Sequence, residues 1–139
     1  MAQDQAPAPQ PMVQETEWPG VSVALISAKS ASGNMLVIKF SYSNSGAKKV
    51  DIPLLANMHA DESLADQVYY VDAKNKKKYM AVKDSDGKTL GTVMRRDNFS
   101  IEPAGSRNCW VQFPAPPADA TKISVYLPGA PPFEDVSIQ

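Results

Sequence analysis

The sequence predicts an all-β domain in which about seven to nine short strands form an antiparallel β-sandwich. Three observations favour this class. Apolar and polar residues alternate over short runs, which is the spacing of a half-buried strand. Clusters of Gly, Pro, Asn, Asp and Ser separate these runs at intervals of roughly eight to twelve residues. No long segment has the spacing of an amphipathic helix.

The length of 139 residues fits one domain with a tail. We predict that residues 1–19 are a disordered tail, because prolines recur through them, and that residues 20–139 form the sandwich. The first residues are typical of a mature N-terminus left by a signal peptide, or of a tether between an anchor and a domain. We therefore expect an exported protein, periplasmic or extracellular. A cytoplasmic protein with a flexible tail is the alternative.

The first half of the sandwich is predicted to contain three strands. Residues 20–28 and 35–43 alternate clearly between apolar and polar side chains. The turn signal at 44–46 leads us to expect that residues 48–52 return beside 35–43 as a hairpin. We expect residues 54–64 to be an irregular connection that holds at most one helical turn.

The next strand is predicted to be central in its sheet. Residues 66–72 carry apolar side chains on both faces, which is typical of a strand with neighbours on both sides. A turn at 74–77, a returning strand at 78–82 and a second turn at 84–87 are expected to follow. Residues 89–94 have a weaker pattern, which fits an edge strand or a loop.

The clearest hairpin signal lies in residues 98–117, and we expect the rest of the chain to pack onto it. Pro103 and Gly105 suit a tight reversal. Alternating apolar residues flank this turn, namely Phe99 and Ile101 before it and Cys109, Val111 and Phe113 after it. Two further strands are predicted at 123–127 and around 136–138.

These strands and turns indicate a sandwich of the immunoglobulin-like kind, without the Cys…Trp…Cys signature of antibody domains. Most of the chain after Gly20 also resembles a family of uncharacterised bacterial immunoglobulin-like domains, found in secreted lipoproteins and beside OmpA-like envelope domains. The matching positions are turn glycines, core aromatics and strand ends: Asn44, Gly46, Asp72, Lys77, Lys78, Tyr79, Pro103, Gly105, Phe113 and Pro114. The resemblance implies an exported β-sandwich, and it implies no catalytic role for these residues.

The overall composition limits the classes of partner. Lys and Arg number 14 and Asp and Glu number 15, so no global charge points to nucleic acid or to an anionic membrane. No apolar run reaches the roughly eighteen residues of a membrane span. The single cysteine, Cys109, excludes an intrachain disulfide, and its apolar alternation predicts a buried thiol that acts as a small hydrophobe.

The sequence does not predict an enzyme. The single histidine, His59, lies near Asp61 and Ser63 in a polar connection, where it fits a surface or capping role better than a catalytic one. The adjacent acidic pairs at 61–62 and 134–135 are interpreted as solvated charges.

Two sequence patterns could suggest a metal site, but neither is diagnostic of one, so we expect no cofactor. Met58 and His59, with Met80 or Met94, offer ligands that suit Cu(I), and a Met/His copper carrier is therefore one alternative function. Methionines more often fill gaps in a core. Residues 84–87 resemble part of a calcium loop but lack its third acidic ligand and its closing Glu, so they are predicted to be a turn.

The most informative asymmetry is a cluster of basic residues between 74 and 96. Eight basic residues lie there against two acidic ones: Lys74, Lys76, Lys77, Lys78, Lys83, Lys88, Arg95 and Arg96. They are the candidate site for an anionic ligand such as a wall polymer, lipid headgroups or an acidic protein face. The alternative is that the lysines keep an exposed hairpin soluble and block edge-to-edge pairing. Tyr79 alone does not make a stacking platform, so we expect no nucleic acid.

Taken together, these features predict a non-enzymatic module that acts by protein–protein recognition in the bacterial envelope, with another envelope or secreted protein as its partner. An anionic-ligand module that uses residues 74–96 is the first alternative, and the copper carrier is the second.

Overall fold

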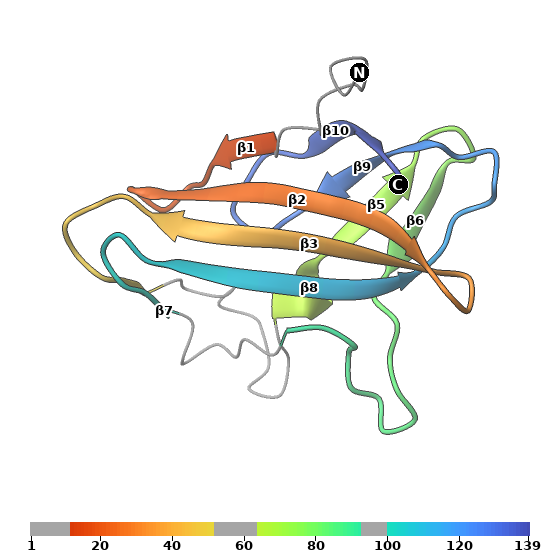
Figure 1. The fold of residues 1–139 in the computed structure, drawn as a ribbon, viewed down its shortest axis with the longest axis horizontal. Helices are drawn as coiled ribbons and strands as arrows, with labels where there is room; N and C mark the ends of the chain where they lie inside the picture. The colour runs from red at the N-terminus through yellow and green to blue at the C-terminus, as the bar shows by residue number, and fades with distance from the viewer. Residues whose placement is uncertain (1–11, 52–63, 93–99) are drawn as a thin grey trace, which may run out of the picture.

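The computed structural model describes residues 12–51, 64–92 and 100–139, and in these ranges the chain is all-β (Figure 1). Ten antiparallel strands form two four-stranded sheets and one two-stranded sheet. No α-helix occurs in the described ranges, where the one helical element is the short 3-10 turn η2 (Leu64–Gln67). The two larger sheets pack face to face over one core, so the predicted all-β sandwich class is confirmed.

The larger sheet has the strand order β1-β2-β3-β8. Its strands are β1 (Met12–Glu15), β2 (Val21–Ala31), β3 (Met35–Asn44) and β8 (Ser106–Pro114). Buried and less buried residues alternate along β2, β3 and β8, as the apolar period of two predicts. A bulge shifts the register of β2 after Leu25, so two residues of β2 lie opposite one residue of β3 at this point.

The smaller sheet has the strand order β10-β9-β5-β6. Its strands are β10 (Phe133–Ser137), β9 (Lys122–Tyr126), β5 (Tyr69–Asp72) and β6 (Lys77–Met80). The central position predicted for the strand at 66–72 is confirmed, because β5 pairs with β6 on one side and with β9 on the other. That strand is shorter than predicted, since its first residues belong to η2.

The two hairpins predicted around the turns at 44–46 and 103–105 do not form. The segment after β3 forms β4 (Val50–Asp51), which pairs with β7 (Ser100–Ile101) and not with β3. The turn at 103–105 forms as expected, with Gly105 N donating to Glu102 O at 2.9 Å. It connects β7 to β8 in a different sheet, so the segments around it do not pair as a hairpin. Alternation predicted the strands here, but local sequence could not show which strands pair.

The segment after β6 covers the free edge of β8. Val82 N donates to Gln112 O at 2.8 Å, and Gln112 N donates to Leu90 O at 3.0 Å. Gly91 forms an isolated bridge with Val111. The described part of the segment predicted as an edge strand or loop is therefore a loop that follows a sheet edge.

Residues 12–19, which the sequence assigned to the tail, belong to the described fold. Met12–Glu15 pair regularly with β2, and Trp18 packs against the core and lies 6.2 Å from the Tyr42 ring. Gly129 makes room for Trp18, because a Cβ at residue 129 would come within 2.3 Å of the indole ring. The predicted disordered tail is therefore wrong for residues 12–19, and residues 1–11 lie outside the described ranges.

The core joins the inner faces of both sheets. It is formed by aliphatic and aromatic residues, and its largest fully buried members are Tyr42, Tyr70, Phe40, Phe113, Phe133, Leu36, Ile38, Ile101 and Ile123. The hydroxyls of Tyr42 and Tyr70 donate to the carbonyls of Pro128 (2.7 Å) and Pro114 (2.6 Å). These bonds satisfy the hydroxyl groups of two core residues and hold the loop after β9 and the end of β8 against the core.

Cys109 is buried, as its alternation predicted, and its side chain is 4 % exposed. Burial raises the pKa of the thiol from 9.0 to about 12. Because the thiolate is the reactive form, this environment fits a packing role. In the part of the chain that the structure describes, no helix is long and apolar enough to cross a membrane.

Candidate functional site

Several candidate residues from the sequence lie outside the described ranges. They are Met58, His59, Asp61, Glu62, Ser63, Met94, Arg95 and Arg96. Of the suggested copper ligands, the structure describes only Met80, which is 46 % exposed on β6. Among residues 12–51, 64–92 and 100–139, no group of three or more His, Cys, Asp or Glu side chains could hold a metal ion.

The six described lysines of the basic cluster fall into two groups. The first group comprises Lys74, Lys76, Lys77 and Lys78 in the β5–β6 hairpin, and all four side chains are exposed. Buried Asp72 organises the turn of this hairpin, because its carboxylate accepts bonds from Lys74 N at 3.1 Å and from Asn75 N at 3.2 Å. The turn therefore presents its lysines outward on a defined backbone.

The second group, Lys83 and Lys88, lies on the turn at 84–87. Asp84 Oδ1 accepts bonds from Asp86 N at 2.9 Å and from Lys88 N at 3.0 Å, which is the predicted turn. Lys83 lies six residues after Lys77 along the chain, which corresponds to at most about 20 Å of extended backbone. Figure 1 shows the β5–β6 turn at the upper right and the loop after β6 at the lower right, so the six lysines fall into two separate groups.

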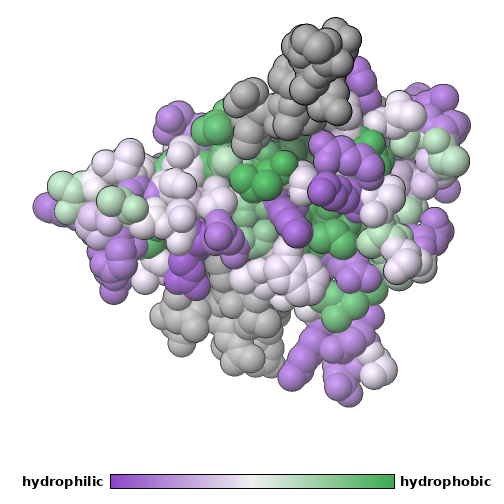
Figure 2. Space-filling model, viewed as in Figure 1, coloured by the Kyte–Doolittle hydropathy of each residue, from purple (hydrophilic) through white to green (hydrophobic). Residues whose placement is uncertain are grey.

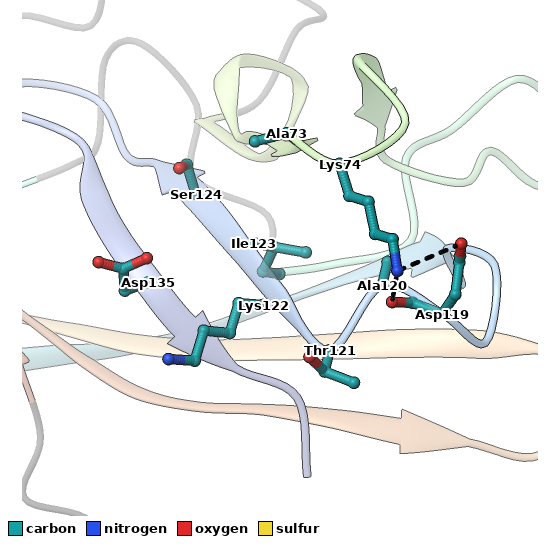
Figure 3. Close-up of a pocket in the computed structure, with 9 residues that line it drawn as sticks. All are labelled: Ala73, Lys74, Asp119, Ala120, Thr121, Lys122, Ile123, Ser124 and Asp135. Carbon is teal, nitrogen blue, oxygen red and sulfur yellow. Dashed lines mark hydrogen bonds and ion pairs between the residues drawn. The ribbon is translucent and has the colours of Figure 1, made fainter.

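A shallow hollow of about 300 Å³ lies beside the first lysine group (Figure 3). Lys74 closes one side of it through an ion pair with Asp119, with 3.7 Å between Nζ and Oδ2. Lys122 and Asp135 lie on the other side, on β9 and β10, with Ser124 close by. The lining thus carries positive charges, negative charges and hydroxyl groups, whereas the basic cluster at 74–96 is almost entirely positive.

A bulge in β10 places Asp135 at this hollow. Phe133 pairs with Val125 and Val136 pairs with Ile123, so two residues of β10 lie opposite Ser124. One of them, Asp135, has a φ of 55°, a left-handed conformation that few non-glycine residues adopt. Both residues of the acidic pair at 134–135 are exposed, as predicted for solvated charges, and Asp135 lies at the edge of the hollow.

An aromatic cluster lies on the same outer face as the hollow. The Tyr69 and Tyr126 rings stack with their centroids 4.5 Å apart, and Lys78 Nζ lies 4.1 Å from the centroid of the Tyr69 ring. Tyr69 pairs directly with Met80 across β5 and β6. We call this group, with Val71 and Ser124 from the adjoining cross-strand row, the Tyr69 face.

The sequence missed the Tyr69 face as a unit. β5 and β9 are separated by about fifty residues of chain, so local alternation could not place Tyr69 beside Tyr126. Their pairing, Tyr69 with Tyr126 and Val71 with Ser124, appears only in the folded sheet. The sequence signal that could have indicated this face is the presence of apolar side chains on both faces of the strand at 66–72.

The larger sheet offers a second exposed surface, which faces the viewer in Figure 2. Its cross-strand pairs place Lys39 between Ser27 and Trp110, and Ile26 lies at the bulge beside them. Ile26 is 48 % exposed and Trp110 is 42 % exposed. Figure 2 shows apolar residues interrupted by polar ones on this face.

Comparison of the chain with protein-family models, curated proteins and solved structures finds no match.

Proposed function

We propose that this protein is a non-enzymatic recognition module that binds another protein through the Tyr69 face. The observation that carries the proposal is the Tyr69–Tyr126 stack, with a partly exposed methionine beside it and Lys78 over one ring. Tyrosine and methionine are enriched in protein interfaces, and a stacked pair loses little side-chain entropy when a partner binds. An acidic group on the partner fits beside Lys78, whose ammonium lies over the Tyr69 ring.

The charge distribution supports an aromatic centre with a polar rim. Lys78 lies on the face itself, and Lys74 and Lys122 lie at the adjoining hollow. Charges at the rim of an interface mainly steer association, whereas desolvated aromatic groups at its centre carry more of the binding free energy. We therefore expect the apolar part of the contact to persist at high salt.

We also propose an immunoglobulin-like topology and an exported location in the bacterial envelope. The strand order supports the topology. In immunoglobulin nomenclature, the larger sheet has the order A, B, E, D, which corresponds to β2, β3, β8 and the 82–92 loop. The smaller sheet has the order G, F, C, C′, which corresponds to β10, β9, β5 and β6. An experimental structure would test this assignment, and fractionation of cells that express the native gene would test the location.

A second candidate function is the binding of an anionic ligand, such as a wall polymer, beside the hollow. The observation that favours it is the position of Lys74 and Lys122 on two sides of the same hollow. Asp119 and Asp135 lie there too and would oppose a highly charged anion. Binding of this kind should weaken steeply as the salt concentration rises.

The experiment compares two matched variants in binding to a bacterial envelope protein fraction. Met80→Ser removes an apolar side chain from the Tyr69 face, and Trp110→Ser removes one of similar exposure from the opposite sheet. We expect Met80→Ser to weaken binding about tenfold or more, with little change for Trp110→Ser. A series at increasing salt separates the two candidates, because binding that disappears with salt favours the anionic ligand. The reverse order of effects, with Trp110→Ser the more damaging, would refute the proposed face.

A further inference from the structure

The four outer edges of the two larger sheets differ in how they are protected. Edge strands expose unpaired backbone groups, and proteins usually protect them with charges, bulges, proline or covering loops. The edge of β8 is covered by the 82–92 loop, for example through Thr92 N, which donates to Trp110 O at 2.8 Å. The edge strand β6 carries Lys77 and Lys78.

The β10 edge is protected in another way. Its register is broken by the bulge between Phe133 and Val136. The bulge contains the acidic pair at 134–135, and Asp135 adopts a left-handed backbone conformation. Both features disfavour the addition of another strand.

The fourth edge, β1, has no bulge, proline or described covering loop within its bounds, and its one charged residue, Glu15, lies at its end. Met12–Glu15 pair with β2 in unbroken register and contain neither lysine nor proline. Val13 is 60 % exposed and Met12 is 40 % exposed. In the described residues β1 pairs only with β2, and Figure 1 shows it at the outer boundary of the larger sheet. This strand is a site where another strand can add.

We propose that β1 pairs antiparallel with β1 of a second copy of this chain, forming a continuous eight-stranded sheet across a two-fold axis. An antiparallel pair of identical strands in one sheet requires a two-fold axis perpendicular to the sheet. Residues that face each other then lie on the same side of the sheet, so Val13 can lie opposite Val13 of the second copy.

The charges of β1 favour this register. Val13 is on the outer side of the sheet, because its neighbour Met12 pairs with buried Leu25 and Val13 itself pairs with Ala24. With Val13 at the axis, the two copies of Glu15 lie about four residues apart along the strand, or roughly 13 Å. The pairing therefore buries the most exposed apolar side chain of the edge and brings no like charges together.

The small size of the contact makes the expected dimer weak. A strand of four residues buries much less than the area of a standard protein interface, so we expect a Kd on the order of 0.1–1 mM. Such a dimer becomes significant when the copies are concentrated, for example on a surface. This self-pairing is independent of the Tyr69 face, which lies on the other sheet.

The test measures self-association of the full chain by sedimentation equilibrium up to about 1 mM, close to the upper limit of the expected Kd. Val13→Lys should weaken the association at least tenfold, because two ammonium groups would face each other at the axis. Val13→Thr keeps an uncharged β-branched residue and should stay within about threefold of wild type. Glu134→Lys adds a positive charge to the β10 edge and should leave the association unchanged. A chain that stays monomeric at 1 mM, or a dimer that Val13→Lys leaves intact, would overturn the proposal.

A second measurement covers the case in which Val13→Lys detaches β1 from its own sheet. A spin label on Glu17→Cys, mixed with ¹⁵N-labelled wild-type chain, reports which residues of the second copy approach it. Buried Cys109 should react slowly with the label. Broadening of the Met12–Glu15 amide signals of the ¹⁵N-labelled copy supports β1 pairing. Broadening confined to another surface, or none at concentrations where the chain associates, contradicts it.

Discussion

Asn44 illustrates how one buried polar residue joins three segments of the chain. Its side-chain amide donates to Lys48 O at 2.8 Å and to Ile101 O at 3.0 Å, and its Oδ1 accepts from Gly46 N at 2.9 Å. The residue is 1 % exposed. It fixes the turn after β3 and at the same time holds the end of β7 beside that turn. The sequence indicated the turn, but it could not indicate the long-range bond to Ile101.

We predict that Asn44→Ala lowers the free energy of unfolding by about 2–4 kcal/mol. The substitution removes three hydrogen bonds, to Lys48 O, Ile101 O and Gly46 N, and the bond to Ile101 O is buried. An unsatisfied buried group costs about 1–3 kcal/mol, and each of the more exposed bonds contributes about 0.5–1.5 kcal/mol. Urea unfolding at neutral pH measures the change. The matched control is Ser45→Ala, which removes an exposed hydroxyl and should stay within about 0.5 kcal/mol of wild type. Equal effects of the two substitutions would contradict this role for Asn44.

Buried groups with raised pKa values predict a loss of stability at alkaline pH. Burial raises the pKa of the Cys109 thiol to about 12, and burial also raises the pKa of Tyr42 and Tyr70 above the usual range. Above about pH 9 the unfolded chain releases protons that the folded chain retains, so the free energy of unfolding falls as the pH rises. Each such group contributes a slope of at most about 1.4 kcal/mol per pH unit.

Cys109→Ala separates the contribution of the thiol. This variant is less stable at pH 8 because it leaves a small cavity, but its stability should fall less between pH 9 and pH 10 than that of wild type. Urea midpoints at pH 8, 9 and 10 measure the two slopes. Parallel slopes for both proteins would show that the thiol is already exposed in the native state.

At the scale of elements, alternation predicts where strands lie better than it predicts which strands pair. Alternation predicted five strands within a few residues of their bounds, because each strand has one buried face: β2, β3, β5, β8 and β9. The hairpins expected around 44–46 and 103–105 are absent, since β3 pairs with β8 across about sixty residues of chain. Pairing across the sandwich depends on core packing between distant segments, which local turn signals do not encode.

The loop at 82–92 depends on a close approach between two backbones. A Cβ at residue 91 would lie 2.8 Å from Trp110 O and 3.2 Å from the Ala65 Cβ. We predict that Gly91→Ala costs about 1–3 kcal/mol, because the loop must move away from β8 and weaken its hydrogen bonds there. Hydrogen exchange should become faster at the amides of Thr92 and Gln112 in particular.

Ser85→Ala is the control for this loop, because Ser85 is exposed at its tip and should be neutral within about 0.5 kcal/mol. If Gly91→Ala left exchange at Thr92 and Gln112 unchanged, the loop would not be held against β8 as described.

For the whole molecule, the sandwich places the two outer faces on opposite sides of one core. The sequence predicted the class of fold and the exposure of the lysines near residues 74–78, which the charge pattern and the hairpin signal made plain. It did not predict the Tyr69 face, which combines side chains from β5, β6 and β9. It did not predict the hollow either, which combines the β5–β6 turn with β9, the segment before β9, and β10. The six described lysines also separate into two groups, because β6 extends the chain between the two turns.

The central claim is that a partner binds on the Tyr69 face. The most direct test is an NMR titration of the ¹⁵N-labelled chain with a bacterial envelope protein fraction at low and high salt. The account predicts salt-resistant shifts at Tyr69, Lys78, Met80 and Tyr126, with the Trp110 indole signal unchanged. Shifts confined to Lys74, Lys122 and neighbours that vanish at high salt would favour the anionic ligand instead. Shifts centred on Trp110 and Ile26, with no shifts in the smaller sheet, would contradict the account.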